Sequence, residues 1–190
     1  MDLMAVIRFT LSLISSASDT RLRKLDDPNG PYTAIILAKA GMLRMAMESR
    51  LTSDLVPPIL HHAVGQGALA VEIRSSDSDA RELCKSLTHR ETFWKCSAER
   101  AMLRGLEGGC SVPVGVHSLL VEGEEEGVAV LTLVGCVTSL DGALHVQEAL
   151  QERVSSATEA EKVGERLANT LLQNGARSIL EGIKKLKTTG

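Results

Sequence analysis

The hydrophobic pattern is clearest in the second half of the chain. Apolar residues at helical spacing predict a helix over 90–106, and Gly108 and Gly109 end it, because glycine readily takes positive φ past a helix end. Three extended runs follow, over 114–121, 128–137 and 144–154. Two helices, over 160–173 and 176–186, complete the pattern. Three strands followed by helices on one face predict an α+β domain.

The first half has the pattern of a partial α/β domain. A short helix is predicted from Asp19 to Leu25, followed by a loop rich in turn residues. Residues 32–38 are almost continuously apolar, which is typical of a strand buried on both faces. The next helix would have Arg44 in its first turn and, along one side, the apolar residues Leu43, Met47 and Leu51.

A glycine-flanked turn at 62–67 joins the two halves, and it contains Gln66. It is followed by residues 68–74, whose alternation predicts another strand, and by a helix over 78–87.

Composition excludes several classes of protein. The 190 residues are 44% hydrophobic and 24% charged, which is typical of a soluble globular protein, and the formal net charge of -3 argues against a general nucleic-acid binder. We expect no membrane partner, since no apolar run is long enough to span a bilayer. The four cysteines form no C-x-x-C pair, so we expect no metal site. Cys84, Cys96 and Cys136 are interpreted as small buried hydrophobes in a reducing compartment.

Residues 99–115, ERAMLRGLEGGCSVPVG, hold a thiol on a glycine-hinged loop between a helix and a strand. A cysteine directly after two glycines at a helix end is more typical of an exposed, functional thiol than of a core residue. This stretch resembles the signature of hydroxymethylbilane synthase, also called porphobilinogen deaminase. The resemblance extends from about Asp19 to the C-terminus.

The resemblance implies a covalent cofactor. In the family the cysteine of the Glu-Gly-Gly-Cys loop carries dipyrromethane through a thioether bond, so Cys110 is the implied attachment point, with Gly109 beside it. The family joins four porphobilinogen units head to tail and releases ammonia at each step. Arg21 and Arg44 match arginines that hold cofactor and substrate carboxylates, and Gln66 matches a hinge residue near the pyrroles. Guanidinium groups suit such a polyanion, because they can bind a carboxylate with two hydrogen bonds.

The resemblance also implies how the chain is divided. Residues 1–18 are an unmatched leader, and Asp2 and Arg8 within it argue against a signal peptide. Residues 19–62 correspond to part of domain 2, which is periplasmic-binding-protein-like. Residues 63–88 are the hinge with a returning strand and helix of domain 1, and residues 89–190 are the cofactor-carrying domain 3.

The catalytic Asp of the family lies in domain 1, and no residue of this chain matches it. We therefore expect a C-terminal portion that is inactive alone, and a monomeric, cytoplasmic enzyme in its full context. Two alternatives remain open: a non-catalytic anion-binding module, and a gene-model fragment without an independent fold.

Overall fold

The computed structural model describes residues 18–106 and 112–188. The chain divides into two compact units, Met1–Asp54 and Leu55–Gly190. Cys110 and Gly109, and most of the predicted leader, lie outside the described residues. The predicted boundaries at 18, 62 and 88 stay predictions.

The first unit contains short helices in its described part. They are α2 (Ser18–Asp26), α3 (Lys39–Arg44) and the 3-10 turn η1 (Glu48–Arg50). The prediction of α2 is confirmed to within one residue at each end. Leu22 and Met42 are buried, and ion pairs join Arg50 to Asp26 and Lys39 to Asp54, each at 2.5 Å.

The predicted strand over residues 32–38 is wrong, because this segment is irregular and half exposed. A strand is stable only when its backbone groups pair with a neighbouring strand, and none lies beside it in the described part of this unit. The periplasmic-binding-protein-like sheet expected here is therefore not observed among the described residues.

The predicted helix after residue 38 is also shorter than expected. It ends at Arg44, because Ala46 takes φ +54° and the chain reverses in a Schellman motif. The amide of Ala46 donates to the carbonyl of Leu43, and that of Met47 donates to the carbonyl of Met42, each at 3.0 Å. Arg44 consequently lies in the last turn rather than the first, and Met47 and Leu51 share no helix face with Leu43.

The second unit contains an antiparallel sheet. Its strands are β1 (Val114–Glu122), β2 (Ala129–Thr138) and β3 (His145–Val154), arranged in that order among the described residues. Each agrees with its prediction to within about one residue. Tight turns make the connections, and Gly142 in the second turn takes φ +71°, as its Asp-Gly sequence predicts.

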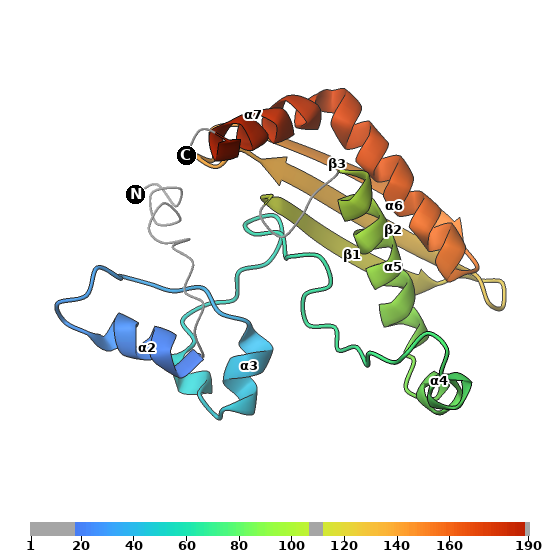
Figure 1. Cartoon of the computed structure of the whole chain (residues 1–190), viewed down its shortest axis with the longest axis horizontal. Coiled ribbons are helices and arrows are strands. Elements are labelled where there is room, and N and C mark those ends of the chain that lie inside the picture. The colour runs from blue at the N-terminus through green and yellow to red at the C-terminus, as the bar shows by residue number, and fades with distance from the viewer. Residues whose placement is uncertain (1–17, 107–111, 189–190) are drawn as a thin grey trace. The chain divides into compact units, whose positions relative to one another are not determined.

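Helices cover one face of this sheet. They are α5 (Arg90–Gly105), α6 (Ala157–Leu171) and α7 (Arg177–Thr188), and Figure 1 shows α5 and α6 side by side across the sheet. The short helix α4 (Ser78–Lys85) has no buried residue and lies away from the sheet. A kink at Leu172–Ala176, where Asn174 and Gly175 leave helical φ/ψ and Gly175 takes φ +113°, separates α6 from α7 and confirms the predicted break. The coarse prediction of an α+β domain with helices on one face is confirmed.

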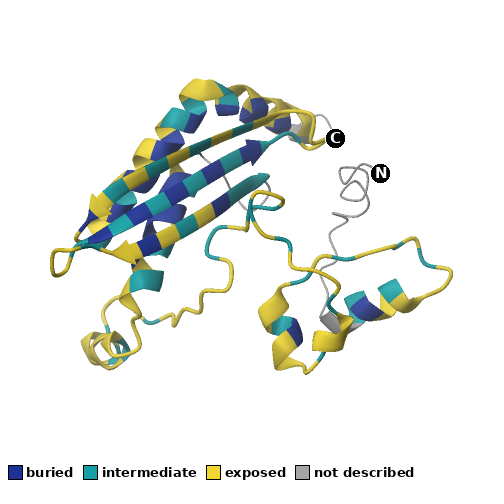
Figure 2. Ribbon diagram, turned by 180° about the vertical axis from the view of Figure 1, so that it is seen from behind, coloured by how far each residue is buried: buried dark blue, intermediate teal, exposed yellow. Residues whose placement is uncertain are grey.

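The core lies between the sheet and these helices. Burial alternates strictly along β2, as the dark blue and teal bands in Figure 2 show. Leu131 and Leu133 of β2 meet Met102 of α5 and Leu167 and Leu171 of α6, and all five are fully buried. Period-2 alternation in the strands and 3.6-residue spacing in the helices therefore generate one continuous core.

The predicted strand over residues 68–74 is also wrong. This segment is irregular, with Leu69 88% exposed and Val71 63% exposed. The alternation of its residues indicates a strand, but in the described part of the chain it has no partner strand. Two apolar side chains therefore remain in solvent.

Candidate functional site

The glycine-flanked loop at residues 62–68 is docked onto the edge of the sheet. The amide of His62 donates to the carbonyl of Val116 at 3.1 Å, and the amide of Val116 donates back to His62 at 2.8 Å. Val64 packs against the core. The approach at Gly115 is so close that a Cβ there would lie 2.5 Å from the Cβ of His61.

Two overlapping turns shape this loop. Gly65 takes φ +70° and Gly67 takes φ +83°, conformations that glycine adopts without steric cost. The amide of Gln66 donates to the carbonyl of Ala63 at 3.0 Å, and the amide of Ala68 donates to the carbonyl of Gly65 at 3.1 Å. Gln66 thus lies between two left-handed glycines, so its backbone direction depends on both.

A cavity of about 300 Å³ opens where this loop meets α5 and β1. Its walls are largely polar. The loop contributes His62, Gly65 and Gln66, and the opposite walls contribute Thr92, Lys95, Cys96, Glu99, Val116, His117 and Ser118.

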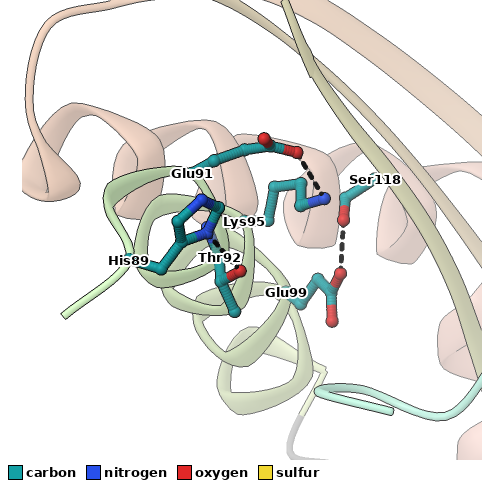
Figure 3. Close-up of polar contacts among 6 residues, drawn as sticks. All are labelled: His89, Glu91, Thr92, Lys95, Glu99 and Ser118. Carbon is teal, nitrogen blue, oxygen red and sulfur yellow. Dashed lines mark hydrogen bonds and ion pairs between the residues drawn. The ribbon is translucent and has the colours of Figure 1, made fainter. Parts of the chain in front are cut away.

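Glu99 is the buried acid of this cavity, at 8% exposure. Its Oε2 accepts a hydrogen bond of 2.7 Å from the amide of Gly65, and its Oε1 accepts one from the hydroxyl of Ser118. Figure 3 shows the contact between Glu99 and Ser118. One carboxylate therefore joins the loop, α5 and β1.

The neighbouring charges lie one and two turns earlier on α5. Lys95 lines the cavity and pairs with Glu91 at 2.8 Å, as Figure 3 also shows. The hydrogen bond from Lys95 and its positive charge lower the pKa of Glu91. At the start of the helix, Nδ1 of His89 accepts from the amide of Thr92 as an N-cap.

Burial, strengthened by the nearby charges of His117 and His62, lowers the pKa of His61. This imidazole is therefore neutral at pH 7. Burial and the carboxylate of Glu99 raise the pKa of Cys96, which keeps that thiol protonated and a poor nucleophile. Cys84, Cys96 and Cys136 are free thiols, partly rather than fully buried.

The predicted site residues are divided between the units. Gln66 lies on the cavity wall, whereas Arg21 on α2 and Arg44 on α3 belong to the first unit. Arg21 is half-buried and Arg44 is exposed. The sequence analysis missed Glu99 as a contact of the loop. The available signal was an acid three residues from both Cys96 and Met102, on the apolar side of the predicted helix.

Two general features bear on other functions. Among the described helices, none combines the length and apolar character that crossing a membrane requires. Within the same part of the chain, no group of three His, Cys, Asp or Glu side chains is arranged to hold a metal ion.

Comparison with known proteins gives the family. Residues 93–173 match the model described as porphobilinogen deaminase, C-terminal domain, and residues 6–82 match porphobilinogen deaminase, dipyromethane cofactor binding domain. The second match begins inside the segment for which the sequence analysis found no resemblance.

Curated relatives agree with these matches. The porphobilinogen deaminase of Schizosaccharomyces pombe is 41% identical over 85% of this chain and 48% of its own length. Those of Kluyveromyces lactis and Synechococcus elongatus are 43% and 45% identical, over 90% and 87% of this chain and 51% and 48% of their own lengths. The chain belongs to the porphobilinogen deaminase family. It spans about half the length of the curated relatives it matches.

Proposed function

We propose that this chain supplies the cofactor-attachment and hinge parts of a porphobilinogen deaminase, a transferase of tetrapyrrole synthesis. The whole enzyme would join porphobilinogen units head to tail and release ammonia. The observation that carries the proposal is the match of both halves of the chain to domains of this one family. The docked loop with Gln66 on a polar cavity supports it.

The chemistry of a thiol suits the attachment of dipyrromethane to Cys110 through a thioether. Leu106, at the end of α5, is buried in the core and Val112 packs against the same core, which supports an attachment point between them in the sequence. Bound dipyrromethane would supply the primer to which pyrrole units are added. Cys110 would hold it covalently, and Gln66 would contact the pyrroles from the cavity wall.

Arg21 and Arg44 would bind the acetate and propionate groups of the pyrrole chain. A guanidinium stays charged at any physiological pH and can bind a carboxylate through two parallel hydrogen bonds. We assign no residue of this chain to proton transfer. The proposal includes a monomeric, cytoplasmic enzyme and a first half related to periplasmic-binding-protein-like α/β domains. The free thiols of Cys84, Cys96 and Cys136 support the reducing compartment.

Mass spectrometry of the purified chain, incubated with hydroxymethylbilane, tests this function. We expect the Cys110 thiol to displace the hydroxyl of the hydroxymethyl group as water, which gives a tetrapyrrole thioether on the peptide that contains Cys110, absent in Cys110→Ser and retained in the matched control Cys84→Ser. An adduct that persists in Cys110→Ser would contradict the assignment. So would its absence in the parent chain under conditions where a full-length relative is loaded, and the anion-binding alternative would then be favoured.

Loading also tests the arginines. Arg21→Leu and Arg44→Leu should lower the loaded fraction, because each removes a cation that binds carboxylates. Arg23→Leu is the matched control from α2, since its guanidinium is exposed and bonds to Thr20 at 3.2 Å. Equal loading in all three variants would show that the two assigned arginines do not hold the cofactor.

A further inference from the structure

Glu99 stands out as a buried acidic side chain on the wall of the cavity in the second unit. In the described part of the chain, the buried polar side chains are Ser97 and Glu99, and Glu99 is the ionisable one. A buried carboxylate loses its hydration, so it must be compensated by hydrogen bonds or charges from the protein. The hydrogen-bond partners of Glu99 therefore indicate which parts of the chain its carboxylate positions.

Those partners are two donors from different parts of the chain. The Gly65 amide lies 34 residues before Glu99 and donates to Oε2 at 2.7 Å, whereas the Ser118 hydroxyl lies 19 residues after it and donates to Oε1. Hydrogen bonds to an ionised acceptor are roughly twice as strong as neutral ones. Lys95, one turn earlier on α5, pairs with Glu91 instead.

The contact at Gly65 acts on Gln66. Gly65 is the first of the two left-handed glycines that flank Gln66, and its carbonyl also closes the next turn by accepting from Ala68. Holding its amide in place fixes the peptide plane between Val64 and Gly65, and the bond from Ala68 to the Gly65 carbonyl holds the next peptide, which leads into Gln66. Gln66 itself is exposed on the cavity wall, so this loop geometry, rather than burial, determines its direction.

We propose that Glu99 is a positioning residue: its carboxylate fixes the Gly65 amide and thereby directs Gln66 toward the pyrrole chain. The identity of the ligand rests on the proposed function. The contact between Glu99 and the loop is independent of that function, so the inference and the proposed function can fail separately.

The carboxylate offers one oxygen to each donor. A glutamine at position 99 could keep both contacts, because its oxygen can accept from Gly65 while its NH₂ group donates to the hydroxyl of Ser118. Glu99→Leu has neither acceptor nor donor and therefore breaks both contacts. Glu91→Leu is the matched control, because Glu91 is a partly exposed acid on the same helix that contacts Lys95.

Nuclear magnetic resonance of the labelled chain tests the contact without any cofactor. In Glu99→Leu we expect the Gly65 amide signal to shift and its hydrogen exchange to accelerate about tenfold, as expected for one lost hydrogen bond. The side-chain amide signals of Gln66 should shift as well. Amides of Leu131 and Leu133 report the fold and should not change. Glu91→Leu should leave Gly65 and Gln66 as they are.

An unchanged Gly65 or Gln66 signal in Glu99→Leu, with a native core, would overturn the inference. Should Glu99→Leu disturb Leu131 and Leu133, Ser118→Ala provides the second test. It leaves Oε1 without its donor but retains the Gly65 contact, so Gly65 protection should persist. Loss of that protection together with the core would indicate a purely structural role and overturn the proposal.

Loading with dipyrromethane then tests the consequence. We expect Glu99→Leu to lower the loaded fraction of Cys110, and the double variant Glu99→Leu/Gln66→Ala to be no worse than Gln66→Ala alone, since both act through one side chain. Additive losses, or normal loading with an altered Gly65 signal, would overturn the positioning role. A parent chain that never loads would contradict the proposed function, while the Gly65 and Gln66 signals still decide the contact.

Discussion

Gly164 sets how closely α5 and α6 approach, and Gly164→Ala tests this packing. A Cβ at position 164 would lie 2.0 Å from the carbonyl oxygen of Ala98 and 2.9 Å from the amide nitrogen of Met102. Ordinary van der Waals contact begins near 3.4 Å. Both atoms belong to the backbone of α5, so no side-chain rotation can relieve the clash, and the helices must separate.

Two opposing effects determine the magnitude. Overpacking a well-packed core typically costs about 1–3 kcal/mol. Alanine in place of glycine inside a helix stabilises the helix by about 1 kcal/mol, because its helix propensity is higher. Because the clash involves rigid backbone atoms, and because separation weakens the contacts of Val163 and Leu167, we expect the upper part of the range. The free energy of unfolding should fall by about 2 kcal/mol.

Urea unfolding followed by circular dichroism measures this loss. In thermal unfolding, the melting temperature should fall by about 4–8 °C, at 2–4 °C per kcal/mol. Gly182→Ala is the matched control, because Gly182 lies within α7 and a Cβ there would meet nothing within 4 Å. That variant should gain about 0.5–1 kcal/mol from propensity alone. If Gly164→Ala were as stable as the parent while Gly182→Ala gained stability, the close-packing argument would be refuted.

Three further predictions follow from local contacts. Ser156→Ala removes the N-cap of α6, whose hydroxyl accepts from the amide of Glu159 at 3.2 Å, and should lower the free energy of unfolding by about 1 kcal/mol in urea titration. Hydrogen bonds from the amide and hydroxyl of Ser155 lower the pKa of Glu159 in the folded state. The ionised Glu159 therefore stabilises the folded state above the usual pKa of 4.5, and this contribution is lost as the pH falls through the folded pKa. The stability difference between the parent and Glu159→Gln should therefore shrink on acidification from pH 7, and a difference independent of pH would contradict this. Ala46→Gly should slow hydrogen exchange at the Met47 amide, because glycine adopts φ +54° without the steric strain that alanine has there. Faster exchange at Met47 would count against the Schellman motif.

The second unit from α5 onward could be predicted from the sequence to within a few residues. Its apolar spacing changes from helical to alternating after Gly108-Gly109 and back to helical after Ser155-Ser156, and Asn174-Gly175 separates the last two helices. The segments at 32–38 and 68–74 have equally good strand patterns but are irregular in the structure. A strand pattern describes side chains, whereas a strand also needs a partner for its backbone, and partners are not encoded locally.

The same reasoning explains the candidate site. Gln66 could be singled out because its flanking glycines are a local signal. Glu99 could not be assigned its contacts, since its donors lie 34 residues before it and 19 residues after it in the chain. Only the fold brings the loop, α5 and β1 together.

The scarcity of aromatic residues gives the two units separate spectroscopic reporters. The chain has one tryptophan and one tyrosine. Trp94 is 8% exposed on α5, with the guanidinium of Arg90 5.0 Å from its ring centroid, and it belongs to the second unit. Tyr32 belongs to the first. Fluorescence excited at the red edge of the absorption band therefore follows the unfolding of the sheet unit alone, and the first unit can melt without changing that signal.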